Sequence, residues 1–365
     1  MEPDSAGIPR SLRIAAALGW RILVVAAAVV LLGLALARLR LVVLPVFAAI
    51  LLATALVPPA EWLARRSWPR SLATITVMLA AGLLLAGVAA AIGPQAAREI
   101  GELDVSVGGG VAEVEEWLAS GPLGLSESRA ADLVEGAREE ISGQSGRIAS
   151  GALGGAVLAV EVVAGLLLTL VLLFFFVRDG ARLWGSIVRL FPERHREDLR
   201  EIGRLSWQTL GGYLRGTAIV AVVDAFFIGL ALYLLGVPLV LPLALLVFLG
   251  AFVPLAGAVV AGFAAAMVAL VSEGLVTALI VVAVVVVVQQ LEGDLLQPLV
   301  LGRAVELHPV AVLLAVTAGA VLWGIPGALV AVPITAVAAK TGAYLRFRRP
   351  GAAEAALPQP GSPRP

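Results

Sequence analysis

Long apolar stretches alternate with short polar segments along the whole chain. The runs that lack any formal charge are 22–37, 41–60, 71–97, 274–291 and 307–339. Two further runs contain one carboxylate each: 148–177 with Glu161, and 216–272 with Asp224. A helix needs about 20 mostly apolar residues to cross the hydrocarbon of a bilayer, and these runs lack the alternation of barrel strands. The pattern predicts an all-α polytopic membrane protein with about eight membrane segments.

Composition supports this fold class and narrows the function. The chain is 60% hydrophobic and 14% charged, with a mean hydropathy of +0.99, which leaves too little charge to cover a soluble protein. A net charge of zero gives no field to attract nucleic acid. The absence of cysteine and the presence of two histidines argue against disulfides and metal sites. No Walker loop, zinc-protease or hydrolase motif occurs, so we expect neither an enzyme nor a cofactor.

The charged residues predict an orientation in the membrane. Segment 94–147 has eleven acidic residues and four arginines, whereas 178–215 has eight arginines and five acidic residues. Arginines also precede the first run, separate the second from the third, and follow the last. Because cytoplasmic loops carry the excess of Lys and Arg, both termini are predicted to be cytoplasmic. The first run has an alternative reading as a signal peptide with a cleavage site at 35–37.

These features divide the chain into six parts. They are N-terminal membrane helices (1–93), an extracytoplasmic acidic helical subdomain (94–147), a membrane helix (148–177), a cytoplasmic amphipathic segment (178–215), a C-terminal membrane repeat unit (216–345) and a disordered cytoplasmic tail (346–365). The acidity of the second part has two readings, a solvated face or a cation funnel. In the fourth part, Pro192 opens a helix with one apolar face.

Two apolar segments in the C-terminal third are interrupted near their middles. Each of 239–270 and 308–339 is about 32 residues long and has a Gly/Pro break. Beyond the breaks, 257–261 and 327–331 match closely at an offset of 70 residues. Paired interrupted segments are typical of the substrate sites of secondary transporters, although chance similarity of apolar sequence is the alternative. If both segments are hairpins, the units are inverted repeats; if both are kinked spans, the repeats are parallel. The segment length favours hairpins.

An ordered set of short motifs resembles the AI-2E family of bacterial membrane transporters. The motifs are Phe175-Phe176-Val177-Arg178-Asp179-Gly180, Tyr213-Leu214-Arg215-Gly216, Gly236-Val237-Pro238, Gln289-Gln290-Leu291-Glu292, Leu296-Gln297-Pro298, Gly302-Arg303, Leu307-His308-Pro309 and Gly324-Ile325-Pro326-Gly327. The resemblance runs from about residue 20 to 345 and is strongest after 174. It implies a multi-pass, oligomeric carrier of the bacterial inner membrane, linked in some members to autoinducer-2 export and in others to Na⁺/H⁺ antiport. The family usually has Pro-Tyr-Ile-Gly-Pro where this chain has Pro254-Leu255-Ala256-Gly257-Ala258.

The residues with transport chemistry lie at three places. Amides and carboxylates follow a long apolar helix and offer oxygens to a polyol or Na⁺: Gln289, Gln290, Glu292 and Asp294. An ordinary polar cap is the alternative. The two breaks contribute Pro254, Gly257, Pro326 and Gly327. Asp224, inside an apolar run, is a candidate proton or cation carrier or else a partner of Arg215 or another span.

The remaining candidates are assigned gating or structural roles. Glu161 is a second intramembrane carboxylate, with burial in a subunit interface as its alternative. Arg178 and Asp179 are read as an ion pair that fixes a helix end rather than as a gate. His308 is read as a positioned interfacial histidine rather than a titrating one. Arg215 and Arg303 complete this group.

Three functions follow in order of preference. The first is a gradient-driven exporter of a small hydrophilic molecule of the autoinducer-2 type. The second is a monovalent cation/proton antiporter that uses Asp224 or Glu292. The third is a membrane scaffold without transport. The expected partners are the lipid bilayer, the solute, H⁺ or Na⁺, and further copies of the chain.

Overall fold

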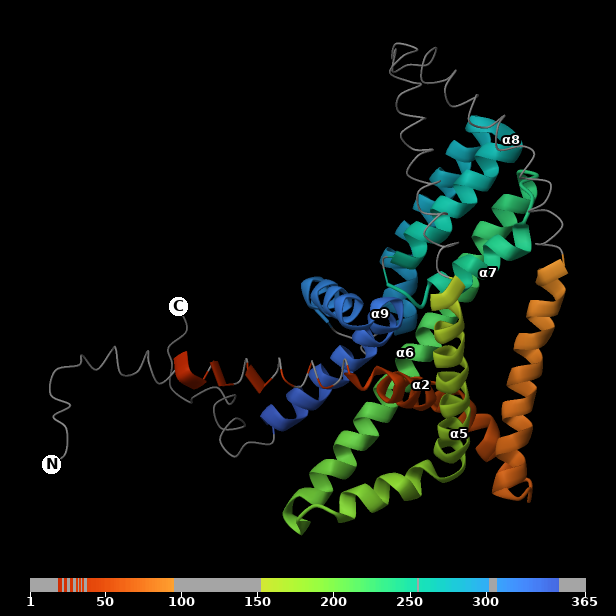
Figure 1. Ribbon diagram of the computed structural model, residues 1–365. Coiled ribbons are helices and arrows are strands. Elements are labelled where there is room, and N and C mark those ends of the chain that lie inside the picture. Colours follow the sequence, from red (N-terminus) through yellow and green to blue (C-terminus); the bar gives the residue numbers. More distant parts are fainter. Residues whose placement is uncertain are drawn as a thin grey trace, which may run out of the picture.

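Every regular element that the structure describes is helical. The computed structural model describes residues 38–94, 152–254, 256–301 and 307–347, and scattered positions between 19 and 35 (Figure 1). The elements are α2 (Arg40–Arg65), the helix Arg70–Pro94, α5 (Ala152–Arg189), α6 (Glu193–Leu234), α7 (Val240–Gly250), α8 (Ala256–Leu291), the π-helical segment η1 (Glu292–Leu301) and α9 (Pro309–Phe347).

The predicted fold class is confirmed within these ranges. Six helices are long and apolar enough to cross a membrane, and no strand occurs among the described residues. The predicted outer subdomain beyond Pro94 and the tail beyond Phe347 lie outside the described residues, and the first predicted span is described only at scattered helical positions. The total of eight segments therefore stays a prediction.

Helices α2 and α5 pack side by side and run in the same direction. Near their starts, the Arg40 guanidinium lies 3.1 Å from a carboxylate oxygen of Glu161, and Gly165 packs against Pro45 further along. The end of α2 therefore lies at the same end of the bundle as the arginine-rich part of α5. We call this the basic end, and the other the opposite end.

A long helical hairpin projects at the basic end (Figure 1). Helix α5 does not stop at Gly180 but continues to Arg189, and α6 begins three residues later behind Pro192. Trp184 of α5 covers Gly203 of α6 so closely that any side chain at Gly203 would collide with the indole ring. Helix α6 then continues into the apolar run without a break, so the segments 178–215 and 216–345 share one continuous helix.

Glycines with positive φ fold the next elements back on one another. Gly236 (φ 75°) joins α6 to α7, and Gly274 (φ 84°) divides α8 into two arms. A Cβ at Gly229 of α6 would lie 3.1 Å from Ala244 of α7, and one at Gly262 would lie 2.9 Å from Val285 in the other arm of α8. Glu273 lies near Gly236, so both turns are at the opposite end.

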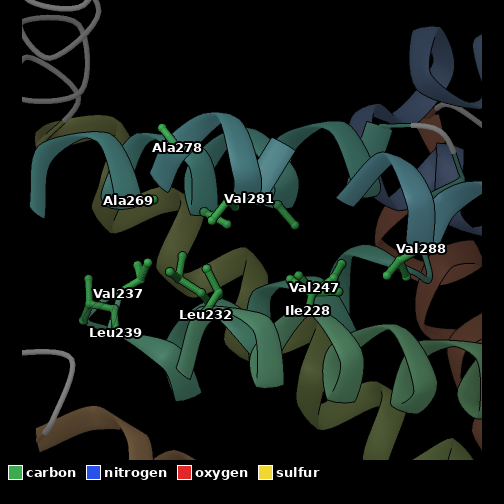
Figure 2. Close-up of a cluster of buried hydrophobic side chains, with 12 residues drawn as sticks. Ile228, Leu232, Val237, Leu239, Val247, Ala269, Ala278, Val281 and Val288 are labelled. Atoms are coloured by element: carbon green, nitrogen blue, oxygen red, sulfur yellow. The ribbon is translucent and has the colours of Figure 1, made fainter. Parts of the chain in front are cut away.

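The resulting helices enclose an apolar cluster. Figure 2 shows its side chains projecting between the helices: Ile228 and Leu232 from α6, Val247 from α7, and Ala269, Ala278, Val281 and Val288 from α8. Small residues on α8 let its arms approach closely. These apolar contacts pack α6, α7 and α8 together in the part of the bundle next to the opposite end.

Both interrupted segments are helical hairpins, so that alternative from the sequence is confirmed. At the tip between α7 and α8, the backbones of Gly250 and Gly257 touch, and a side chain on either would overlap the other's main chain. Gly319 and Gly327 touch in the same way across the break at Trp323 and Gly324 within α9.

The two hairpins enter the bundle from opposite ends. The first starts at the Gly236 turn and returns to the Gly274 turn, both at the opposite end. The second returns to the basic end, where the Tyr344 hydroxyl donates a hydrogen bond to Asp198 of α6 (2.9 Å). The two hairpins therefore open towards opposite ends of the bundle, as the inverted-repeat alternative predicts, and α6 packs against both of them.

Candidate functional site

Asp224 is the one acidic side chain that is fully buried in the described part of the chain, with 2% of its surface exposed. It lies eight residues, about 12 Å of helix, beyond Gly216 and ten residues, about 15 Å, before the end of α6. This places the carboxyl group deep within the membrane-spanning part of the helix. A carboxyl group at such a depth is costly unless another polar group compensates for the lost water.

The compensating group is the carboxyl of Glu292. Glu292 is the first residue of η1, which packs against α6, and its side chain is half-buried. The two carboxyl groups interact electrostatically and share a side-chain hydrogen bond. The Oδ1 atom of Asp224 is buried and has no hydrogen-bond partner. The pair therefore leaves one acceptor oxygen unused inside the protein.

This arrangement has a definite chemical consequence. An ionised carboxyl group has no proton to donate, so two carboxyl groups form a hydrogen bond only when one of them is protonated. Two neighbouring carboxylates repel one another when both are ionised, and a shared proton or a bound cation removes that repulsion. The pair is thus suited to holding one positive charge that can be exchanged.

The local backbone explains how Glu292 reaches α6. Helix α8 ends at Leu291, and the chain continues as a π-helix, a rare form that is frequent at functional sites. Pro298 lies within η1 and cannot donate the backbone hydrogen bond of a regular α-helix.

The other residues of the predicted polar site do not join this pair. Gln289 is half-buried, whereas Gln290 and Asp294 are exposed. Among the four predicted side chains at the junction of α8 and η1, Glu292 is the one that interacts with Asp224.

The hairpin tips place backbone groups inside the bundle. Gly257 and Gly327 are buried at the two glycine contacts, Pro254 is half-buried beside the first, and Pro326 is exposed beside the second. At the second tip, the indole Nε1 of Trp323 is buried without a hydrogen-bond partner.

The predicted Arg178–Asp179 ion pair is present, with 3.3 Å between Nε and Oδ2, and Arg182 binds the same carboxylate at 3.3 Å. Because α5 continues through these residues, the pair lies within a helix and marks no helix end.

Arg215 is exposed and folds back towards Gly211, so the partner of Asp224 is Glu292 and not Arg215. Arg303 lies outside the described residues.

His308 and Glu161 have structural partners. The exposed His308 accepts a hydrogen bond at Nδ1 from the backbone N–H of Val310 (3.3 Å), so it caps the start of α9. Glu161 pairs with Arg40, which lies at the start of α2, in a segment that the predicted orientation places outside the cytoplasm although it is basic. The ion pair explains why a basic residue is present at that position.

Sequence reasoning missed a row of buried hydroxyl groups on α6. Thr209, Tyr213 and Thr217 are 5%, 6% and 8% exposed, and Tyr213 shares a hydrogen bond with Thr217. Their spacing of four residues, with Asp224 two turns further on, is a signal that the sequence contains.

The long apolar helices, the two helical hairpins and the buried carboxyl pair define a polytopic α-helical membrane protein. Comparison with known proteins agrees with this class. The model of the AI-2E transport family, described as AI-2E family transporter, matches residues 22–346, and the chain belongs to this family.

Relatives in several bacteria have names that refer to transport. A "Putative transport protein" of Mycobacterium tuberculosis is 41% identical over 91% of both chains. One of Synechocystis is 28% identical over 80% of this chain and 75% of its own. The "Putative permease PerM" of Escherichia coli is 27% identical over 48% of this chain and 50% of its own. The protein is a membrane protein with a role in transport.

Proposed function

We propose that the protein is a gradient-driven secondary transporter in which Asp224 and Glu292 together bind the coupling cation. The observation that carries this proposal is the hydrogen bond between two carboxyl groups deep in the spanning part of α6, with one Asp224 oxygen unpartnered. A membrane protein that needed only stability would place apolar side chains there, because they carry no desolvation cost. The carboxyl pair is therefore better explained by the transport role.

The available driving force is sufficient for such a carrier. One charge that crosses the membrane gains about 2.3 kcal/mol per 100 mV. This free energy corresponds to a concentration ratio of roughly fiftyfold for the coupled solute. No nucleotide-binding loop occurs in the sequence, and coupling to one cation supplies the energy without it.

For the solute, we propose a small hydrophilic molecule of the autoinducer-2 type that is moved outwards. The tips of both hairpins bring backbone carbonyl groups close to one another, and the buried Trp323 N–H adds an unsatisfied donor. Such groups suit a molecule rich in hydroxyl and carbonyl groups. The glycine pairs at the tips let the broken helices approach without side chains between them.

The carboxyl pair also supports a second function, monovalent cation/proton antiport. One site that binds either H⁺ or Na⁺, but not both, exchanges the two ions when it faces each side of the membrane in turn. Nothing in this mechanism requires an organic solute.

Transport assays in proteoliposomes test both functions. We expect the wild type to move labelled autoinducer-2 under an imposed proton gradient, and Asp224→Asn and Glu292→Gln to reduce this flux by about a hundredfold or more, since each removes an exchangeable charge. Glu273→Gln is the matched control, because Glu273 lies at the exposed Gly236 turn. Wild-type flux in both site variants would refute the proposed cation site.

Antiport is measured in the same vesicles with an internal pH dye. A Na⁺ gradient without autoinducer-2 should change the dye signal if the second function holds. A dye response that Asp224→Asn abolishes, together with absent autoinducer-2 flux, would favour antiport over export.

We also propose that the basic end faces the cytoplasm of a bacterial inner membrane and that the protein assembles as a homo-oligomer. Support for the orientation comes from the parallel packing of α2 and α5. It brings Arg65, Arg66 and Arg70 to the same end as the arginines of the α5–α6 hairpin.

A further inference from the structure

The surroundings of Asp224 differ sharply along α6. Towards the basic end, the same face of the helix carries Thr217, Tyr213 and Thr209, all buried. Towards the opposite end, it carries Ile228 and Leu232, which belong to the apolar cluster shown in Figure 2. The carboxyl pair thus has hydroxyl groups on one side and a closed apolar core on the other.

The hydroxyl groups form one narrow row. With about 100° between successive residues of an α-helix, the positions of Thr209, Tyr213, Thr217 and Asp224 fall within an arc of roughly 80°. Arg215, nine residues before Asp224, falls about 180° away and is exposed. Polar groups are therefore concentrated on the buried face that leads to the carboxyl pair.

The charged residues of the elements packed against α6 are exposed or lie towards the ends of the bundle. In α2 and η1, Arg40, Glu61, Arg65 and Asp294 are exposed, and the charged residues of α5 beyond Glu161 lie in its arginine-rich part at the basic end. Helix α7 has no titratable residue, and the one in α8, Glu273, lies at the opposite end. In α9, Lys340, Tyr344 and Arg346 lie in the last turns, where Tyr344 meets Asp198 near the start of α6. Glu292 is thus the charged residue that interacts with Asp224 in the described structure.

We propose that the Asp224–Glu292 pair exchanges a proton with the solution at the basic end alone, through the hydroxyl row Thr209, Tyr213 and Thr217 of α6. This inference rests on the proposed function and specifies its coupling ion and the side from which that ion enters. Each hydroxyl group accepts one proton and releases another, so the row relays protons without net change. Asp224 lies seven positions, about 10 Å of helix, beyond Thr217, so the proposed route requires about three hydrogen-bonded water molecules to bridge this step.

The apolar cluster on the other side of the carboxyl pair is compatible with alternating access. In this conformation, Ile228 and Leu232 are buried in the apolar cluster between the pair and the opposite end, and apolar side chains offer a proton no hydrogen-bonding groups. Release at the opposite end then requires the helices around the apolar cluster to separate, which couples proton movement to a conformational change.

Infrared spectroscopy of the full-length protein in lipid nanodiscs tests the inference without any solute. A protonated carboxyl group has a distinct carbonyl stretch that shifts when its proton is replaced by deuterium. We expect the wild type to show this band and Asp224→Asn to lack it. After transfer to D₂O, Thr217→Val and Tyr213→Phe should shift the band at least about tenfold more slowly than the wild type, because each breaks the relay.

Two controls separate a relay from a general change in packing. Thr217→Ser keeps the hydroxyl group and should restore the wild-type exchange rate. Thr335→Val removes a hydroxyl group from α9 that donates to Ala331 of its own helix (2.8 Å), and it should leave the rate unchanged.

The possible outcomes distinguish the two proposals. A wild-type band that shifts at the wild-type rate in both Thr217→Val and Tyr213→Phe overturns the proton route but leaves the carboxyl pair as a cation site. A wild type without the band overturns the shared proton, and the route fails with it. Slow exchange in these two variants, with normal exchange in both controls, establishes the route.

Discussion

At the scale of single residues, Asp224 shows how burial and chemistry combine. Its carboxyl group is buried, meets another acid and leaves one oxygen without a partner. An unsatisfied buried acceptor costs about 1–3 kcal/mol. A residue that costs stability where an apolar one would not is expected to be retained for what it does.

We expect Asp224→Asn to be at least as stable to heat as the wild type. The amide can donate a hydrogen bond to Glu292 without needing a bound proton, so the midpoint of thermal unfolding in detergent should stay the same or rise by a few degrees. Transport should be lost in the same variant. A fall of many degrees would show instead that the carboxyl group serves mainly to hold α6 against η1.

At the scale of elements, the hairpin tips depend on glycine pairs. Gly250 and Gly257 touch at the first tip and Gly319 and Gly327 at the second, in each case with main chain against main chain. Backbone cannot move aside as a flexible side chain can, so even one methyl group is expected to open the tip.

Gly257→Ala and Gly327→Ala should therefore destabilise the protein by about 1–3 kcal/mol and reduce transport. The matched control is Gly82→Ala in the helix Arg70–Pro94, where a Cβ would meet nothing within 4 Å. Alanine favours the helix over glycine, so this control should gain about 0.5–1 kcal/mol. Thermal unfolding and flux assays on the three variants measure the contrast, and equal effects at all three positions would contradict it.

At the scale of the whole molecule, both hairpins pack against α6, the helix that carries Asp224 of the carboxyl pair. The two hairpins enter from opposite ends, so each side of the membrane has one element that can open towards the pair. This arrangement is compatible with the alternating access that the proposed carrier function requires.

Cysteine labelling in whole cells measures the orientation of this arrangement. The chain has no cysteine, so single replacements are read without background. We expect Ser186→Cys, in the α5 part of the basic end, to react only after the inner membrane is permeabilised, and Glu273→Cys, at the opposite end, to react with an impermeant reagent in intact cells. The reverse pattern would invert the proposed topology.

The sequence by itself determined the membrane class, the helical content, the two interrupted segments and the family. These depend on composition, apolar length and local breaks, and the bilayer enforces them because every backbone group must be paired within the helices. Only the tertiary structure decided that both breaks are hairpins and that Glu292, rather than Arg215, is the partner of Asp224. It also decided that Arg40 pairs with Glu161 and that the hydroxyl row lies on the buried face of α6. The physical reason is that such contacts depend on how helices cross. In such apolar sequences, many alternative helix packings would bury similar apolar surfaces. The contacts between the few polar side chains distinguish the native packing, and these contacts are seen only in the tertiary structure.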